Sequence, residues 1–386
     1  MQAPFSPDTV FRQSNRISSG STIRKDGSLH RKSGSHRWQS AVADRYSKPA
    51  RWYSCFGRVV QLDRADGTNS PLFTDGFENK ASGICHYCTV DTLKEILNTG
   101  CLRFSDVRFL NDSTEFIEII PLIENVLSCN GYTSDFRKLI LESAEMKELK
   151  EYHQSYIGFS RIAHKCEQKI YRTYTCSFST ENDSLSMWNY YASSGEGVSI
   201  AFDHSWNMFE GSDRSEVNIR EELKNDIVIY RGLIVYKRED KKKCIMELLN
   251  VLQQIYNEAR NEIKKYRGHI LFAFKESINH MRCFFKNESF ACENEYRIVL
   301  KIPEELLLAE ECSGDILKKG QFKRGNILIP FVDYKFKRDS IKHIVTNPFI
   351  REENSMFELG IRELLWQNKM EDVDIFSSGI PIRKYN

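Results

Sequence analysis

The sequence lacks any long apolar run, and no stretch approaches the roughly 18 apolar residues of a membrane span. It also lacks an excess of either charge, since 55 Lys and Arg stand against 53 Asp and Glu, a net charge of +2. We therefore expect no membrane partner, and the charge balance argues against a generally basic nucleic-acid binder.

A disulfide framework is absent as well. The chain has 11 cysteines, an odd number at irregular spacing. Its CxxC motif, Cys85-His86-Tyr87-Cys88, has no second pair of ligands at a zinc-site spacing, so we expect no metal. Free thiols are typical of a reducing compartment, and we expect a cytoplasmic protein.

What is present is ordinary for a soluble globular protein: 386 residues, 41% apolar and 28% charged. Residues 1–80 show no helical or strand periodicity and are rich in Ser, Arg and Gly, so we expect disorder there. Residues 1–53 carry ten Lys or Arg against three Asp, which permits a basic arm that touches nucleic acid. The run from Gly57 to Arg64 resembles the conceptual translation of a transfer-RNA gene, and we favour a spurious N-terminal extension over a functional arm.

Regular periodicity begins near Ile84 and continues to the end of the chain. Helices are expected at 90–99, from Asp112 or Ser113 onward, and at 135–152, 185–191, 241–265, 269–285 and 355–369. Strands are expected at 101–105, 171–178, 198–202, 227–236 with a break or bulge at Gly232, 290–300, 327–331, 342–346 and 373–376. This mixed order predicts one α+β domain over residues 84–386, with a largely antiparallel sheet flanked by helices and a helical insert at about 240–285.

The most informative strand is the one that carries Glu293, Glu295 and Arg297. Alternate side chains of a strand point to opposite faces, so these three are expected on one face and apolar Tyr296 and Ile298 on the other. Two interpretations stay open: a solvated outer face with an internal ion pair, or a pair of carboxylates at the rim of a cleft.

Several short motifs recur in a fixed order along the chain. They are His86-Tyr87, Leu110-Asn111-Asp112 with Glu115, Ser177-Phe178-Ser179, Met187-Trp188 with Tyr191, Gly195-x-Gly197, Glu293-x-Glu295-Tyr296-Arg297 and the closing Ser378-x-Ile380-Pro381-x-Arg383. Together they resemble the bacterial domain of unknown function 2971 family over about Ile84 to Arg383. This resemblance implies no activity.

A more distant resemblance is to the ADP-ribosyltransferase plan. The features that carry it are an early His-Tyr before a helix and the turn Gly100-Cys101-Leu102, a central helix with aromatic residues, and the late Glu-x-Glu. The resemblance implies that NAD is a substrate and that the acceptor is a macromolecule, either protein or nucleic acid. A defence or toxin role rests on this analogy alone.

The same resemblance implies roles for particular residues. His86 would hold the nicotinamide ribose, Tyr190 or Tyr191 would stack on nicotinamide, and Glu295 would stabilise the oxocarbenium that forms when the glycosidic bond breaks. Glu293 would position the acceptor. The remaining residues expected to bind NAD are Tyr87, Ser179, Trp188 and Arg297. Two features depart from the plan: an early His with a late Glu-x-Glu usually belongs to different branches, and the helical insert is unexpected.

Each of these residues also has a structural interpretation. His86 is a candidate core histidine, Trp188 and Tyr191 are candidate core aromatics, and Asp112 is a candidate helix cap. The competing function is therefore a non-catalytic binding or effector module with a structural Glu-x-Glu-x-Arg strand. If the motifs form an active site, one pocket should be lined by His86, Ser179, Trp188 or Tyr191, and Glu295.

Overall fold

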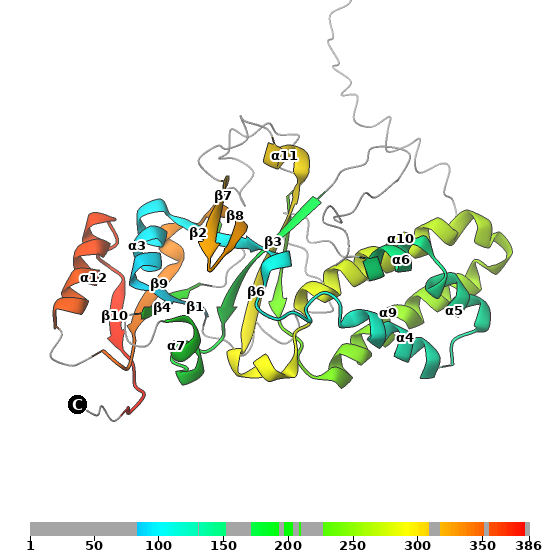
Figure 1. The fold of residues 1–386 in the computed structure, drawn as a ribbon, viewed down its shortest axis with the longest axis horizontal. Helices are drawn as coiled ribbons and strands as arrows, with labels where there is room; N and C mark the ends of the chain where they lie inside the picture. Colours follow the sequence, from blue (N-terminus) through cyan, green and yellow to red (C-terminus); the bar gives the residue numbers. More distant parts are fainter. Residues whose placement is uncertain are drawn as a thin grey trace, which may run out of the picture. The chain divides into compact units, whose positions relative to one another are not determined.

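The computed structural model describes residues 83–129, 131–151, 171–192, 197–203, 208–209, 227–308, 317–350 and 355–382 (Figure 1). All of them belong to one compact unit, Arg51–Asn386. The interpretations of residues 1–80 and of the turn at Gly195 lie outside the described residues. None of the described helices is both long and apolar enough to cross a membrane.

The fold is α+β, built on a ten-stranded sheet that is antiparallel except between β9 and β10. Its order is β10-β9-β4-β1-β3-β2-β8-β7, and β6 pairs with both β3 and β5. The strands are β1 (Ile84–Thr89), β2 (Cys101–Asp106), β3 (Tyr171–Ser179), β4 (Gly197–Phe202), β5 (Val228–Leu233), β6 (Glu295–Pro303), β7 (Leu317–Arg324), β8 (Ile327–Lys335), β9 (Ile341–Thr346) and β10 (Asp374–Ser377).

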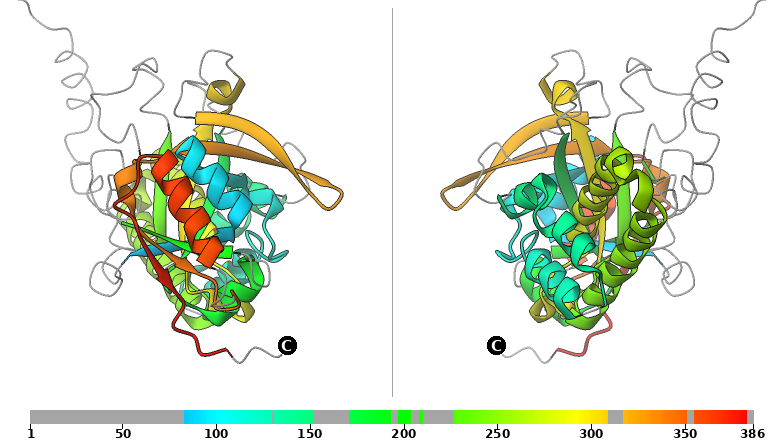
Figure 2. Two further views of the ribbon diagram at one scale, coloured as in Figure 1. Left: turned by 90° about the vertical axis from the view of Figure 1, so that its left-hand side faces the viewer. Right: turned by 90° about the vertical axis from the view of Figure 1, so that its right-hand side faces the viewer.

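Two groups of helices flank this sheet (Figures 1 and 2). The helices α3 (Val90–Thr99) and α12 (Ser355–Gln367) lie side by side and pack their apolar faces on the sheet core. A second core lies within the helical part, formed by α4 (Ile119–Cys129), α5 (Ser134–Leu141), α6 (Ala144–Lys150), α9 (Arg238–Glu258) and α10 (Ile263–Met281). The expected helical insert corresponds to α9 and α10. Shorter helices are α7 (Leu185–Tyr191) and α11 (Glu304–Leu308).

Strand β3 positions the site because its two edges are used differently. One edge pairs with β6 along the whole strand, from Tyr171 to Ser179. The other edge is shared: β2 pairs at Tyr174 and Thr175, and β1 pairs at Ser179. The strands β1 and β2 therefore diverge along β3, and the segment 176–178 between them faces neither strand. An opening in the sheet results at this point.

Local sequence signals explain both ends of α3. The side chain of Thr89 accepts a hydrogen bond from the Thr92 amide and caps α3, and Gly100 ends it in the left-handed conformation at φ 65°. Both ends agree with the prediction. The prediction of a single helix at 135–152 is wrong. This segment forms two helices, α5 and α6, and the Ser143 side chain caps α6.

Three other predictions are corrected. The second helix begins at Ile119 and not at Asp112 or Ser113, because Phe116 adopts a left-handed φ of 67° that no helix continues through. Gly232 stays in register opposite Arg297, so there is no break or bulge. Strand β6 begins at Glu295, because Glu293 ends a short 3-10 helix, η6 (Glu288–Glu293), and the next residue is left-handed.

Candidate functional site

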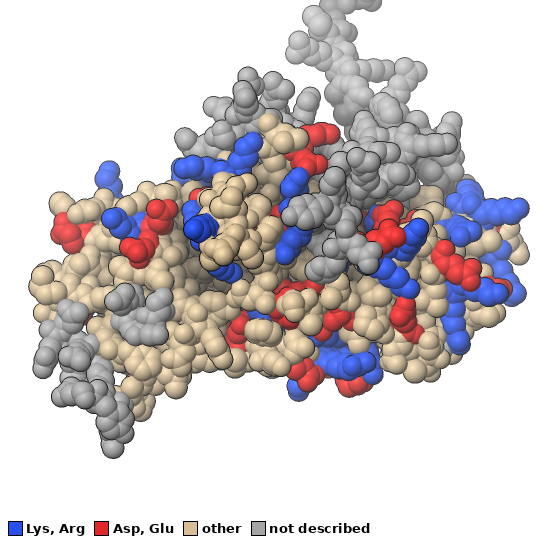
Figure 3. Space-filling view, viewed as in Figure 1, with Lys and Arg blue, Asp and Glu red and all other residues tan. Residues whose placement is uncertain are grey.

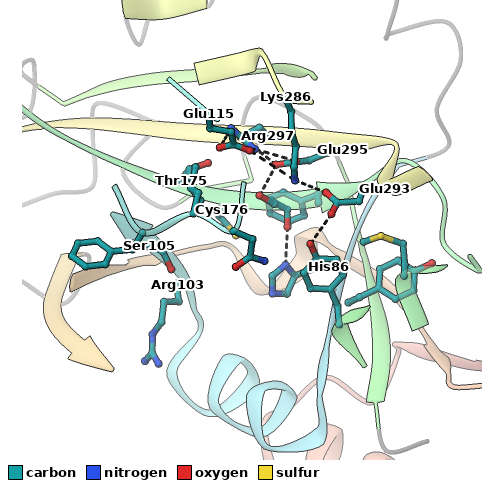
Figure 4. A pocket seen from close by; sticks show the side chains of 18 of the residues that line it. His86, Arg103, Ser105, Glu115, Thr175, Cys176, Lys286, Glu293, Glu295 and Arg297 are labelled. Carbon is teal, nitrogen blue, oxygen red and sulfur yellow. Dashed lines mark hydrogen bonds and ion pairs between the residues drawn. The ribbon is translucent and has the colours of Figure 1, made fainter. Parts of the chain in front are cut away.

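A cavity of about 200 Å³ lies where β1 and β2 diverge (Figure 4). His86 comes from β1, Ser177 from β3 and Tyr191 from the end of α7. Glu293 ends η6 and Glu295 begins β6. Residues far apart in the sequence therefore meet in one concave site, which is the usual form of a ligand-binding site.

The inner wall of the cavity is a buried cluster of charged side chains. Its five members are Glu115, Lys286, Glu293, Glu295 and Arg297, each at most 5% exposed. Burying charges without partners is costly, so the contacts within the cluster decide whether it is stable. Acidic groups outnumber basic groups three to two in it.

Glu295 is the centre of this cluster, and each of its carboxylate oxygens accepts two hydrogen bonds. Oε1 accepts from the Ser177 hydroxyl at 2.6 Å and from Nε of Arg297 at 2.7 Å. Oε2 accepts from Nη2 of Arg297 at 3.0 Å and from Nζ of Lys286 at 2.9 Å. Burial alone would raise the pKa of Glu295, but Arg297 and Lys286 outweigh it and lower the pKa to about 2. Glu295 is therefore ionised at neutral pH.

Glu293 reaches the same cluster from outside the strand. Its Oε2 accepts from Nζ of Lys286 at 2.5 Å, and its Oε1 accepts from the Tyr191 hydroxyl at 2.8 Å. Burial and the nearby Glu293 carboxylate raise the pKa of Tyr191, so the phenol keeps its proton and remains a donor. Burial would lower the pKa of Lys286, yet Glu295 and Glu293 raise it, so the ammonium stays charged.

Arg297 anchors the cluster to the rest of the protein. Its guanidinium contacts Glu115 at 3.1 Å and donates to the Cys283 carbonyl at 2.9 Å. Burial raises the pKa of Glu115, against the attraction of Arg297. Every charged member of the cluster thus has a partner, and the guanidinium is held on several sides by fixed acceptors.

His86 sits at the opening between the strands, where Nδ1 lies 3.1 Å from the Ser177 carbonyl oxygen. A carbonyl oxygen only accepts, so Nδ1 carries the hydrogen and Nε2 of the neutral ring is an acceptor. Burial lowers the pKa of His86, which favours this neutral form. Because no strand pairs with residues 176–178 on this edge of β3, the His86 imidazole provides the hydrogen bond to the Ser177 carbonyl oxygen.

Cations and apolar side chains form the outer side of the cavity. Arg103 from β2 is held by both oxygens of Asp333, at 2.9 and 3.1 Å. Arg324, at the end of β7, is exposed and donates to Oδ1 of Asn111 at 2.9 Å. Leu110 and Ile329 also line the cavity. The cavity is therefore acidic inside and basic outside.

The structure brings six of the eight predicted site residues to the cavity wall. They are His86, Tyr87, Tyr191, Glu293, Glu295 and Arg297. The interpretation of Glu293, Glu295 and Arg297 as a solvated outer face is wrong, because all three are buried. The expectation that Glu293 shares the strand with Glu295 is also wrong, although its carboxylate joins the same cluster.

Ser179 does not line the cavity, which corrects the expectation for this residue. Of the expected pair Trp188 or Tyr191, Tyr191 lines the cavity and Trp188 does not. Ser179 is fully buried, donates to the Glu293 carbonyl at 2.7 Å and accepts from the Glu181 amide. Trp188 is fully buried, and its Nε1 donates to Asp183 at 2.8 Å. Tyr190 is 72% exposed and not part of the lining, so of the two candidate stacking tyrosines Tyr191 is the one in place.

Other residues of the site had no assigned role in the sequence. Glu115 belongs to one of the sequence motifs, and Lys286 groups in the sequence with Glu293, Glu295 and Arg297, but nothing in their spacing indicated that Lys286 bridges Glu293 and Glu295. No sequence pattern indicated that Arg103 or Arg324 belongs to the site, because their positions depend on how β2, β7 and β8 pair. Within the described residues, no group of three or more His, Cys, Asp or Glu could hold a metal ion.

Comparison with known proteins gives one match. A family described as protein of unknown function (DUF2971) matches residues 187–298, a range that contains Tyr191, Lys286, Glu293, Glu295 and Arg297. Over these residues the chain is similar to that family. No curated protein and no solved structure matches, so the comparisons add no activity.

Proposed function

We propose that the cavity binds the nicotinamide end of NAD and that the protein transfers ADP-ribose to a macromolecule. The observation that carries this proposal is the polarity of the cavity. Acidic groups are in excess on the inner wall, and Arg103 and Arg324 lie on the outer side. NAD has the matching polarity, with a positively charged nicotinamide ring at one end and a diphosphate beyond the ribose.

The size of the cavity supports partial insertion of such a ligand. Sites that enclose a drug-sized molecule usually measure about 300–1,000 Å³, whereas this cavity has about 200 Å³. It suits one ring and part of a ribose, and the rest of a dinucleotide would extend past Arg103 and Arg324. Guanidinium groups suit phosphate oxygens in both charge and geometry.

The chemistry follows from this placement. The bond between the ribose C1′ and the nicotinamide nitrogen breaks, and nicotinamide leaves as a neutral molecule with the electron pair. Positive charge develops on the ribose, and a lone pair of the acceptor forms the new bond to C1′ while the acceptor loses a proton. The positive charge thus moves from the nicotinamide ring to the ribose, and fixed negative charge near C1′ stabilises it there more than on the ring.

The protonation state of each residue suggests its role in the transfer. Glu295, with a pKa of about 2, is too weak a base to take a proton at neutral pH and would act through its charge. Nε2 of neutral His86 would accept a hydrogen bond from a ribose hydroxyl. Glu293, held by Tyr191 and Lys286, would orient the acceptor, and the Tyr191 ring would contact nicotinamide.

The test is NAD turnover by the purified full chain with cell lysate, measured as nicotinamide release and as labelled product. Glu295→Gln keeps the shape and removes the charge, and it should lower the rate on the order of 10²–10³-fold. Glu276→Gln is the matched control, since Glu276 forms a partly buried ion pair with Lys301 of β6, away from the cavity lining. It should keep the rate.

Because Glu295→Gln disturbs a buried network, its melting temperature must be measured alongside, and Tyr191→Phe provides a milder second variant. Turnover by Glu295→Gln and Tyr191→Phe at the wild-type rate would contradict the proposal. So would a wild-type protein that neither binds NAD nor releases nicotinamide.

A non-catalytic binding module is the second candidate, and one observation favours it. Both oxygens of Glu295 already accept two hydrogen bonds from the protein, so the network is complete without a ligand. In this case Glu295 is structural. Binding of a ligand in the cavity without any release of nicotinamide would support this second function.

A further inference from the structure

The hairpin of β7 and β8, which extends away from the rest of the sheet (Figure 2), has two different faces. Its strands pair in register from Leu317↔Tyr334 to Arg324↔Ile327, and directly paired residues share a face. One face belongs to the sheet core, because Leu317 and Tyr334 are buried in that core. The other face turns toward the cavity, whose lining includes Arg324 and Ile329.

Side chains from three strands form one continuous surface on the cavity side. The Arg103 guanidinium of β2 lies 3.8 Å from the centre of the Phe331 ring. The Phe322 and Phe331 ring centres are 6.0 Å apart, and the Arg324 guanidinium lies 5.6 Å from the centre of the Phe322 ring. Ile327 pairs directly with Arg324 and is 56% exposed. We call these five residues the hairpin face.

The base of the hairpin face is tightly packed, and its outer part is open. The Phe331 ring lies so close to Gly320 that any side chain there would clash. Further out, Phe322 is half-buried, and Arg324 and Ile327 are exposed. Figure 3 shows Lys and Arg side chains beside uncharged surface in the region of β7 and β8. The open part therefore combines an aromatic ring, a guanidinium and an aliphatic side chain.

This open part begins where the proposed ligand leaves the cavity. Ile329 lines the cavity and pairs directly with Phe322, so one strand spacing of about 4.8 Å separates their backbones. Arg324, which would contact the diphosphate, is two residues from Phe322 on the same face. Beyond its diphosphate the dinucleotide continues with a ribose and adenine. The adenine would therefore reach Phe322 and Ile327.

The side chains at this point suit the face of a purine. Phe322 and Ile327 lie diagonally across the strand pair, about 7–8 Å apart, a separation that the two fused rings of adenine can cover. Bases stack on aromatic side chains and on guanidinium planes, because every base has an apolar π-face. The charge also fits, since Arg103 and Arg324 would flank the phosphates that precede the base.

We infer that the open part of the hairpin face binds the adenine of the dinucleotide, with Phe322 and Ile327 against the base and Arg324 on the diphosphate. The position of the ligand rests on the proposed binding of NAD, but the adenine contacts do not depend on the transfer reaction. ADP carries the base, the ribose and the diphosphate without nicotinamide. It should therefore bind to this site by itself.

The test is isothermal titration of the full chain with ADP and, separately, with inorganic pyrophosphate. Ile327→Ser and Phe322→Leu should each weaken ADP binding about tenfold, because each removes apolar contact with the base. Both variants should bind pyrophosphate as wild type does, since it has no base. The melting temperature of each variant shows whether the hairpin remains folded, and Ile327→Ser is the milder change because Ile327 is exposed at the tip.

The matched control is Leu328→Ser. Leu328 follows Ile327 in the sequence and is similarly exposed, at 60%, but it pairs with Lys323 and belongs to the opposite face of the hairpin. The same kind of apolar side chain is removed from the same tip, and the affinities for ADP and for pyrophosphate should both stay unchanged.

Wild-type affinity for ADP in Ile327→Ser and Phe322→Leu would overturn the inference, and so would an equal loss in Leu328→Ser. A wild-type protein that binds pyrophosphate as tightly as ADP would overturn it as well. ADP binding that depends on Phe322 and Ile327, in a protein that releases no nicotinamide, would uphold the inference while the proposed transfer fails. Nicotinamide release by both variants with the wild-type KM for NAD would overturn the inference and leave the proposed function intact.

Discussion

Glu295 shows at the scale of one residue how the site is built. Its pKa is about 2, because Arg297 and Lys286 outweigh the effect of burial, whereas its ordinary value is 4.5. A carboxyl group with a lower pKa in the folded state stabilises the fold above its unfolded pKa, and the contribution disappears as the pH falls from about 4.5 to about 2. At neutral pH this contribution is on the order of 3 kcal/mol.

Glu295→Gln should therefore unfold more easily than wild type at pH 7, and the difference should shrink toward pH 3. Chemical denaturation at both pH values measures it. Glu358→Gln, which removes an exposed carboxylate paired with Arg362, should change the free energy of unfolding by less than about 1 kcal/mol at either pH. A difference between Glu295→Gln and wild type that is constant with pH would contradict the ion-pair account.

Single residues were also where the sequence was most informative. His86, Tyr191, Glu293, Glu295 and Arg297 were all predicted for one site, and all line the cavity. The sequence did not show that Trp188 is a core residue. An aromatic residue on a short helix gives the same sequence pattern whether it faces a core or a ligand. Its burial depends on Tyr87, which packs against it with ring centres 4.8 Å apart.

At the scale of elements, local signals explain the ends of α3 and fail for the sheet. Thr89 and Gly100 set both ends of α3, since capping depends on residues within one turn. The divergence of β1 and β2 along β3 depends on pairings between segments about 70–95 residues apart, such as Cys85 with Ser179. No local pattern contains that information, and the cavity follows directly from it.

Replacing each of two glycines with alanine should change the stability of the protein in opposite directions. Gly100 has a left-handed φ of 65°, so Gly100→Ala should destabilise the protein by about 1 kcal/mol. Gly360 is exposed in the interior of α12 with open space around it, and Gly360→Ala should stabilise the protein by about 0.5–1 kcal/mol. Thermal unfolding of both variants checks this, and effects of the same sign would contradict the difference between the left-handed helix end at Gly100 and the helix interior at Gly360.

At the scale of the whole molecule, the described part of the chain holds two large apolar cores and two smaller apolar clusters, with the polar site at the edge of the two large cores. The sheet core contains Ile298 and Leu300 of β6, and the helical core contains Met281 and Phe285. Lys286 follows the helical core directly and Arg297 lies on β6 between buried apolar neighbours. The charged cluster is thus held by elements from both cores, which fixes its geometry before any ligand binds.

Comparing NAD with NADH tests directly whether this site is acidic inside and basic outside. They share the same diphosphate and adenosine, but the nicotinamide ring of NAD is positively charged and that of NADH is neutral. We expect isothermal titration to show NAD binding at least about tenfold more tightly, a difference of about 1.4 kcal/mol. Glu293→Gln and Glu295→Gln should reduce that preference, whereas equal or tighter binding of NADH by the wild-type protein would contradict the account.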